Sequence, residues 1–308
     1  MAPDLRPGGP QRLMRLATIA SMAVALVLLV AKAVAWWITD SMAMLSSLVD
    51  TALDLVGSLV TFFAVRQALI PADADHRFGH GKAEALAGLV QAGFIAASGT
   101  ALLLSVAERI ANPHQVHQEE IGLVISALAV TLTLALVAFQ RHVVQRSGSI
   151  AIDADMAHYK TDLVASIVTG GGLYLSGRLG QPLIDSGVAG VVALYLMHGA
   201  WLVGRRSLDV LMDRELPDAE RRRIRDIVHS HPEVRGVHEL RTRSAGLTKF
   251  IQLHVVLDPT MSLGNAHVVG DRIEAMLHQA FPDAEIILHV DGWDDRDIDG
   301  RAAERPAA

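Results

Sequence analysis

Two pairs of metal-binding residue types, each with a spacing of four, stand out in otherwise apolar parts of the chain. The first pair is Asp50 and Asp54, and the second is His158 and Asp162. Residues four apart in an α-helix project from the same face, so each pair presents two ligands together. A charged residue at the centre of a bilayer costs ~3 kcal/mol on insertion scales. We therefore expect the two pairs to face each other within a membrane and to hold a divalent cation between two helices.

The type of metal follows from the ligand atoms, which come from one imidazole and three carboxylates. Four ligands on two rigid helices can form a tetrahedral shell, which suits Zn²⁺. Fe²⁺, Mn²⁺, Co²⁺ and Cd²⁺ are compatible with the same atoms. The chain has no cysteine, so thiolate sites and disulfides are both excluded. The structural alternative is a hydrogen-bond network between the helices, with Lys160 as its counter-charge.

The imidazole of His158 also suggests how metal movement is driven. An unperturbed imidazole has a pKa near ~6.5, so it can exchange a proton for a metal ion around cytoplasmic pH. Metal binding and protonation compete for the same groups. The sequence therefore predicts an antiporter in which a proton gradient drives metal outward.

The elements that must position these residues are long apolar helices. Of the 308 residues, 51% are hydrophobic and only 19% are charged, whereas a soluble protein carries about 25% charge. A membrane-spanning helix needs roughly 20 mostly apolar residues. Six such stretches are predicted, and the second and fifth carry the two pairs: Leu16–Thr39, Met42–Val65, Ala85–Ala107, Ile121–Gln140, Ala154–Gly177 and Ser186–Gly204.

Lysine and arginine are distributed unevenly between the two ends of these predicted spans. The side that carries both termini has Arg6, Arg12, Arg15, Arg66, Arg77, Lys82, Arg141, Arg146, Arg205 and Arg206, and the other side has Arg109 and Arg178. Because cytoplasmic loops are enriched in these residues, we expect a multi-pass protein of the inner (plasma) membrane with both termini in the cytoplasm. No basic run of the kind that binds nucleic acid is present.

The last third of the chain has the pattern of a small soluble domain. Helical periodicity and strand alternation predict an αββαβ order, which is typical of a ferredoxin-like α+β fold. The expected elements are Pro217–Ser230, Val237–Arg243, Lys249–Leu257, Ser262–Gln279 and Glu285–Val290. The predicted organisation is therefore a disordered N-terminus (1–11), a membrane α-helical bundle of six transmembrane helices (12–211), a C-terminal cytoplasmic domain (212–293) and a disordered tail (294–308).

Four motifs resemble the cation diffusion facilitator family, in particular its bacterial ferrous-iron and zinc efflux branch. They are Ser47–Asp54 (SLVDTALD), Pro71–Glu84 (PADADHRFGHGKAE), Ala154–Asp162 (ADMAHYKTD) and Leu216–Asp218 (LPD). The resemblance extends from about Leu13 to Asp291. It implies a homodimer that alternates between inward-open and outward-open states, with Asp50, Asp54, His158 and Asp162 as the transport site.

The resemblance also implies a second metal site in the loop between the second and third spans, at Asp73, His76 and His80. The residues themselves agree only in part with this implication. His76 and His80 are four apart and could share a metal in a helical loop, but Phe78 and Gly79 favour a turn. A solvated loop with two unligated histidines is the alternative.

Further sites are implied in the C-terminal domain, where metal ions would bridge two copies of the domain in the dimer. Strand alternation supports this independently, because His289 and Asp291 are two residues apart and share one face of a strand. His254 and His238 lie on the two preceding predicted strands. The implied ligands are His238, His254, His267, His289 and Asp291.

Two other classes of function compete with a metal exporter. An intramembrane metalloenzyme would need an open coordination position and a general base, and the chain has no His-Glu-x-x-His sequence. A membrane-bound metal sensor would use the sites of the C-terminal domain, but it would not require acidic pairs inside the membrane. The sequence therefore favours a transporter for zinc, with iron(II), cadmium and manganese as further substrates.

Overall fold

A computed structural model of the protein describes residues 9–40, 42–111, 120–179 and 182–292. The chain separates into two compact units, Met1–Leu211 and Met212–Ala308. The predicted disordered tail, residues 294–308, lies outside the described residues, as does most of the predicted disordered N-terminus. The first helix already begins at Pro10, two residues before the predicted start of the helical bundle at residue 12.

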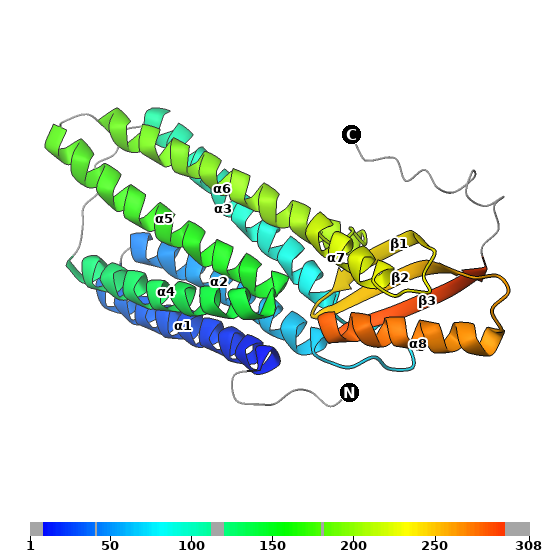
Figure 1. Ribbon diagram of the computed structural model, residues 1–308. Coiled ribbons are helices and arrows are strands. Elements are labelled where there is room, and N and C mark those ends of the chain that lie inside the picture. The colour runs from blue at the N-terminus through cyan, green and yellow to red at the C-terminus, as the bar shows by residue number, and fades with distance from the viewer. Residues whose placement is uncertain (1–8, 41, 112–119, 180–181, 293–308) are drawn as a thin grey trace. The chain divides into compact units, whose positions relative to one another are not determined.

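The N-terminal unit consists of six long α-helices (Figure 1). Each contains one of the six predicted spans and extends it, because the polar residues at the ends of the spans also adopt helical conformation. The bounds are Pro10–Thr39 for α1, Met42–Ala68 for α2, Ala83–Ala111 for α3, Glu120–Ser147 for α4, Ile150–Leu179 for α5 and Pro182–Leu211 for α6.

Five of these helices contain a described segment that is long and apolar enough to cross a membrane. The exception is α5, which carries charged residues in its first half. Helix α5 instead contacts each of the other five long helices. The first half of this helix, which holds His158 and Asp162, is therefore packed among other helices, and its charged residues are buried or partly buried.

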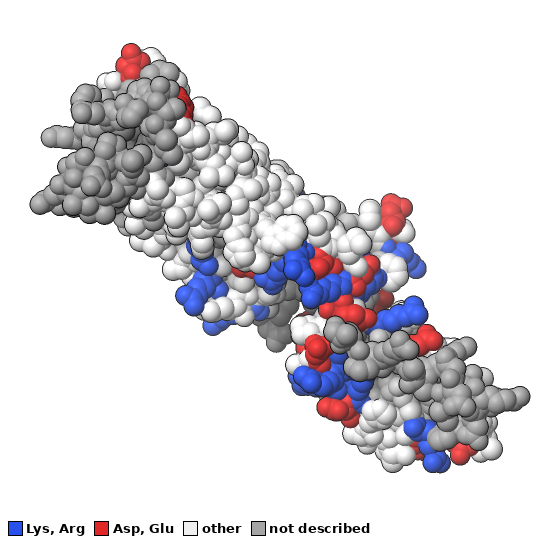
Figure 2. Space-filling view, turned by 90° about the horizontal axis from the view of Figure 1, so that it is seen from above, with Lys and Arg blue, Asp and Glu red and all other residues white. Residues whose placement is uncertain are grey.

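The surface of the helical unit matches a lipid environment. Large apolar side chains such as Val30, Leu104 and Val191 are more than half exposed. Figure 2 shows a broad uncharged band on this unit, with Lys and Arg gathered at one of its ends. An apolar band bounded by charge is expected of a helical bundle that crosses a bilayer.

Small residues allow α3 and α6 to pack closely. A Cβ atom added at Gly88 would collide with Oγ of Ser207, and one at Gly99 would lie 3.1 Å from Sδ of Met197. Close packing over small residues is the usual way in which helices associate within membranes. The α3–α6 pair forms one wall beside α5.

A buried carboxylate fixes the start of α5. Glu84, in the first turn of α3, is 2% exposed and accepts hydrogen bonds from Oγ of Ser149 and from the backbone N–H of Ala151. The first N–H groups of a helix have no partner within the helix, and an anion there is favourable. Glu84 therefore attaches the N-terminus of α5 to α3.

The C-terminal unit confirms the predicted αββαβ order. It comprises α7 (Asp218–His229), β1 (Gly236–Ala245), β2 (Thr248–Leu257), α8 (Leu263–Ala280) and β3 (Ala284–Gly292). In the three-stranded sheet, β2 lies in the middle, antiparallel to β1 and parallel to β3. Both helices pack on one face of the sheet, and their shared core includes Ile224, Leu253, Val255, Ile273 and Leu277.

Candidate metal centres

The two predicted pairs of ligands meet between α2 and α5. Nε2 of His158 lies 3.0 Å from Oδ1 of Asp54 and 3.3 Å from Oδ2 of Asp162. One ligand atom from each of these residues lies within 4.8 Å of the other two, so the three could share one ion. The structure thus brings together Asp54, His158 and Asp162, which we call the transport cluster.

The fourth predicted ligand, Asp50, does not converge with the transport cluster. It lies one helical turn before Asp54 on α2, and its side chain is exposed. The two carboxylates still interact electrostatically. A four-ligand protein shell would require the Asp50 carboxylate to move toward the other three groups.

Unpaired polar atoms in the transport cluster fit a role in binding a cation. The imidazole of His158 is only 5% exposed. Within the described residues, its Nδ1 and Oδ2 of Asp162 are buried without a hydrogen-bond partner. Buried polar atoms are rarely left unpaired. Nε2 of His158, rather than the unpaired Nδ1, faces the two carboxylates. It is therefore the nitrogen that would bind an ion placed among them.

A second buried carboxylate, Asp155, lies three residues before His158 and has a different environment. It is 1% exposed, and it accepts hydrogen bonds from Oγ of Ser21 at 2.7 Å, Nε2 of Gln91 at 3.1 Å and Nε2 of Gln140 at 2.7 Å. These donors belong to α1, α3 and α4. One side chain of α5 therefore connects four helices.

Hydroxyl groups extend this network to α2. Oγ of Ser21 lies 2.9 Å from Oγ of Ser58, which lies 2.8 Å from the hydroxyl of Tyr159. Tyr159 directly follows His158, and the two rings make an edge-to-face contact. The network thus supports the transport cluster from one side and connects all of the first five helices.

A lysine also approaches the transport cluster, and it is not the one considered from the sequence. Lys160 lies about 200° around α5 from His158, on the opposite side of the helix. Lys32 of α1 instead reaches α2, where its Nζ donates to Oγ1 of Thr51 at 2.6 Å and to the carbonyl oxygen of Ser47 at 3.3 Å.

Neither Lys32 nor Asp155 was among the predicted site residues. Both are charged residues in predicted spans, and that property alone marks an intramembrane residue as a functional candidate. Their partners could not be found in the same way, because they lie on other helices.

The predicted loop site also forms a cluster. Between α2 and α3, Oδ1 of Asp73 lies 3.4 Å from Nδ1 of His76, and Oδ2 of Asp73 lies 3.4 Å from Nε2 of His80. The loop is a turn rather than a helix, with Gly79 at φ +75°. The pKa of Asp73 lies below its usual value, mainly because its carboxylate accepts a hydrogen bond from the backbone N–H of His76. A second hydrogen bond, from the backbone N–H of Asp75, acts in the same direction. The loop cluster therefore offers an ionised carboxylate and two imidazoles.

Three histidines are aligned across the sheet of the C-terminal unit. His238, His254 and His289 occupy paired positions on β1, β2 and β3. Ring centroids are 5.1 Å apart for the first two and 4.7 Å apart for the second two. This histidine row lies on the face opposite α7 and α8, because the alternate residues of β2 are the ones in the core.

Asp291 completes the histidine row. Its carboxylate lies 3.1 Å from Nε2 of His238, 2.9 Å from Nδ1 of His254 and 3.1 Å from Nε2 of His289. Burial alone would raise the pKa of Asp291. The hydrogen bond from His254 and the positive charges of the three histidines outweigh this effect and lower it. His238, His254 and Asp291 are thus close enough to share one ion, and His289 adjoins them through the other oxygen of Asp291.

His267 is the predicted ligand that the structure does not bring to this row. It lies on α8, strongly exposed, and its Nε2 is 3.9 Å from Oδ2 of Asp271. Helix α8 covers the core face of the sheet, whereas the row lies on the other face. Within one copy of the chain, His267 and the histidine row are therefore separate.

Glu239 is an acidic neighbour of the histidine row that was not predicted. The pairing of β1 with β2 shifts between His238 and Arg241, and Glu239 in this bulge has φ +49°. Its Oε2 lies 3.8 Å from Nε2 of His254. Bulges often re-aim a side chain, and this one directs a carboxylate toward the row.

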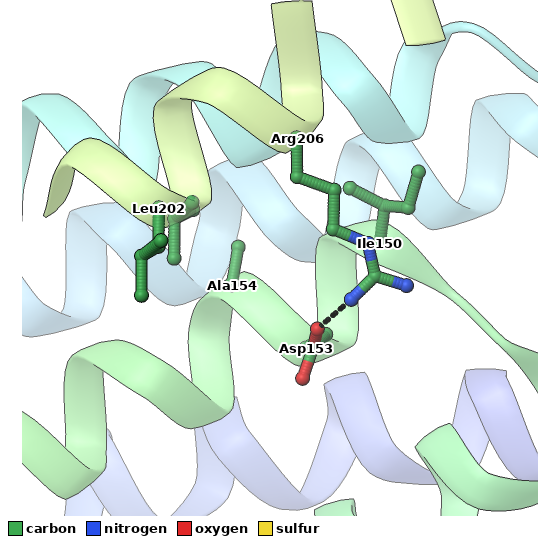
Figure 3. A pocket seen from close by; sticks show the side chains of 6 residues that line it. Ile150, Asp153, Ala154, Leu202 and Arg206 are labelled. Carbon is green, nitrogen blue, oxygen red and sulfur yellow. Dashed lines mark hydrogen bonds and ion pairs between the residues drawn. The ribbon is translucent and has the colours of Figure 1, made fainter. Parts of the chain in front are cut away.

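A small cavity between α5 and α6 is a different feature from these clusters. Its lining includes Ile150, Ala154 and Leu202, together with an ion pair between Asp153 and Arg206 (Figure 3). None of the predicted metal ligands contributes to its lining. Because the only carboxylate there is already paired with a guanidinium, the cavity is not a candidate cation site.

These features define a polytopic membrane protein with a candidate cation site among its helices and a separate α+β domain. Comparison with known families gives the same division. The cation efflux transmembrane domain matches residues 18–212, and the cytoplasmic domain of cation efflux proteins matches residues 216–293. The chain therefore belongs to the cation efflux family, which confirms the resemblance found in its motifs.

Individual relatives match nearly the whole chain. A cation-efflux pump FieF from Pectobacterium atrosepticum is 43% identical over 280 residues, which cover 91% of this chain and 93% of the relative. A FieF pump from Shewanella oneidensis is 43% identical over 277 residues, 90% of this chain and 93% of its own. A solved structure of CzrB in a zinc form is 33% identical and covers 27% of this chain and 97% of its own, with a TM-score of 0.25.

Proposed function

We propose that the protein is a proton-coupled antiporter that exports a divalent transition metal, zinc first, from the cytoplasm. The observation that carries this proposal is the convergence of Asp54, His158 and Asp162 between two helices of the membrane unit. The ion binds there as substrate. Asp50, one turn away on α2, joins the shell as the fourth ligand.

The ligand chemistry supports zinc. One imidazole nitrogen and carboxylate oxygens are common zinc ligands, and a shell without sulfur binds weakly enough to let the ion leave. Iron(II), cadmium and manganese use overlapping ligand sets. They are therefore further substrates to be compared.

The same ligands support exchange with protons. An imidazole binds metal only when its coordinating nitrogen is unprotonated, and a carboxylate binds best when ionised, so metal binding releases protons. Protons that enter from the opposite side would displace the ion. The transport cluster thus provides alternating binding of metal and protons without a second site.

The arrangement in the cell follows the distribution of charge. The end of the helical unit that is rich in Lys and Arg faces the cytoplasm of a bacterial inner membrane, which places both termini there. The protein works as a homodimer. Metal held by the loop cluster and the histidine row supports assembly or regulation rather than transport, with His267 contributing across the dimer.

Metal flux into proteoliposomes across an imposed pH gradient tests this proposal. The purified full-length protein is compared with Asp54→Ala, and Zn²⁺, Fe²⁺, Mn²⁺ and Cd²⁺ are supplied in turn. We expect gradient-dependent Zn²⁺ flux that Asp54→Ala abolishes. Glu108→Ala is the matched control, because this exposed carboxylate of α3 is not part of any cluster described above.

A membrane-bound metal sensor is the second candidate function. The observation that favours it is that the histidine row lies in a unit with its own core, separate from the helices. A protein that binds Zn²⁺ but transports none of the four metals under any gradient would be a sensor. Zn²⁺ flux that persists in Asp54→Ala would instead show that the transported ion does not bind at the transport cluster.

A further inference from the structure

We propose that Lys32 is a resident counter-cation of the transport site. Its positive charge partly neutralises the acidic groups of α2 and α5 and keeps metal affinity low enough for release. This inference rests on the proposed function, because it concerns the site at which the exported ion binds. Lys32 would thus set the metal affinity of the site without touching the metal.

The ammonium group of Lys32 is held over one face of α2. Its Nζ donates to the carbonyl oxygen of Ser47 and to Oγ1 of Thr51. Ser47, Thr51 and Asp54 follow a spacing of four and three, so they lie along one stripe of the helix. Thr51 is buried, at 1% exposure. Lys32 is therefore anchored on the stripe that carries a ligand.

The charge of Lys32 acts on three carboxylates of the site. Its strongest charge–charge interactions are with Asp54, Asp50 and Asp162, in that order. They include both predicted acidic ligands of α2 and the acidic ligand of α5. Lys32 lies on α1, and these carboxylates lie on α2 and α5, so the lysine compensates charge that its own helix does not carry.

Charge balance explains why such a lysine is useful. Three ionised carboxylates carry three negative charges, which one divalent ion and one ammonium neutralise together. Uncompensated charge is very unfavourable away from water. With Lys32 present, all three carboxylates can remain ionised around the metal. The same positive charge repels an arriving cation, which weakens binding and favours release.

Two structural explanations of Lys32 make different predictions. A lysine that only extends toward the membrane surface would direct its ammonium to water, whereas Nζ of Lys32 is bonded to α2. A lysine that only joins α1 to α2 could be replaced by a neutral hydrogen-bond donor. The charge of the residue, rather than its hydrogen bonds, is therefore the property to test.

The test is the kinetics of Zn²⁺ flux in proteoliposomes at one fixed pH, with KM and kcat measured separately. Lys32→Gln retains a donor but removes the charge, Lys32→Met removes both, and Lys32→Arg retains the charge. Lys160→Gln is the matched control, since it removes a lysine from the opposite side of α5. For Lys32→Gln and Lys32→Met we expect a KM about tenfold lower, with a reduced kcat because release is slower. Lys32→Arg and Lys160→Gln should keep the KM of the wild type.

An unchanged KM in both Lys32→Gln and Lys32→Met would overturn the proposal, even if thermal stability fell. Lys32 would then serve only as a structural link between α1 and α2. Equilibrium Zn²⁺ binding to the detergent-purified protein separates this result from failure of the proposed function. If the wild type shows no flux, the antiporter is wrong. In that case the role of Lys32 is tested by equilibrium binding alone. Lys32→Gln should bind Zn²⁺ more tightly than the wild type, at a site that Asp54→Ala removes. Equal binding in Lys32→Gln and Lys160→Gln would refute it.

Discussion

The acidic residues inside the helical unit differ in their partners. Asp54 and Asp162 face an imidazole, and one oxygen of Asp162 is buried without a hydrogen bond among the described residues. Asp155 instead accepts hydrogen bonds from three neutral side chains. The first arrangement leaves carboxylate oxygens available to a cation, and the second uses them to join helices.

Replacement of Asp155 by alanine should destabilise the helical unit strongly. It would remove the acceptor that Ser21, Gln91 and Gln140 share. Ser21 and Gln91 keep a contact with Ser58 and Thr61 respectively, whereas Nε2 of Gln140 would lose its acceptor, and a buried unpaired group costs about 1–3 kcal/mol. We expect a clear fall in the melting temperature of the detergent-purified protein and a loss of Zn²⁺ flux in parallel with the loss of folded protein.

Asp153→Ala provides the control for this variant, two residues earlier on the same helix. Asp153 is paired with Arg206 in a partly exposed position, and such pairs contribute only about 0–1 kcal/mol. A melting temperature that falls equally in the two variants would show that the network around Asp155 contributes nothing special to stability.

At the scale of single residues, the sequence could predict which side chains share a helical face but not which helix they meet. The spacing of His158 and Asp162 was sufficient to propose a common site with α2. The donors around Asp155 come from α1, α3 and α4, and the partners of Lys32 come from α2. Such contacts depend on how the helices pack, which a periodic pattern does not specify.

Among the secondary-structure elements, β1 contains the main departure from regular geometry. Its pairing with β2 shifts after His238, and Glu239 adopts a positive φ of 49°. For a residue with a side chain, this conformation costs roughly 1–2 kcal/mol. The bulge places the carboxylate of Glu239 near His254, so local strain accompanies an additional acidic group beside the histidine row.

Glu239→Gly should have opposite effects on the metal-free and zinc-bound C-terminal domain. Glycine accepts a positive φ without strain, so the metal-free domain should gain up to ~1 kcal/mol of unfolding free energy. The additional stabilisation by Zn²⁺ should decrease, because a nearby carboxylate is lost. Urea unfolding of residues 212–308, with and without Zn²⁺, measures both quantities.

Glu285→Gly is the contrasting control, because Glu285 is an exposed residue of β3 with ordinary strand geometry. Glycine there should lower the stability of the metal-free domain by about 0.5–1 kcal/mol. If Glu239→Gly also destabilised the metal-free domain, the interpretation of the bulge as a strained segment would be incorrect.

The helices and strands themselves could be predicted well. Apolar stretches indicated the six long helices, and alternation indicated the three strands. The bulge and the exact alignment of His238, His254 and His289 could not be predicted, since a pattern of alternation defines the faces of a strand but not its register with a neighbour. His267 shows the same limit, because α8 covers the other face of the sheet.

For the molecule as a whole, the important feature is the division into two units at Leu211 and Met212. The composition of the sequence predicts a boundary near residue 211, because strongly apolar stretches end there and mixed polar patterns begin. Each unit contains at least one cluster of residues that could hold a metal ion. Metal bound to the C-terminal unit can therefore affect assembly without occupying the transport cluster.

Removal of metal should weaken self-association of the full-length protein. We expect a chelator to shift the detergent-purified protein from dimer toward monomer, and Zn²⁺ to reverse the shift. His254→Ala should lose the response to Zn²⁺, because His254 is central in the histidine row. Light scattering coupled to size-exclusion chromatography gives the mass of the protein in each state.

His278→Ala is the matched control, since His278 is an exposed histidine on α8 that pairs only with Glu274 in the described structure. It should dimerise in response to Zn²⁺ as the wild type does. A dimer that persists unchanged in chelator and in His254→Ala would show that metal in the row does not control assembly.

The alignment of three histidines across three strands has a mechanical consequence. An ion bound by the row would cross-link β1, β2 and β3 in a direction perpendicular to the strands, on the face of the sheet opposite α7 and α8. Strands that are pulled past one another would have to break metal bonds as well as backbone hydrogen bonds. The domain would then resist tension differently according to the zinc concentration around it.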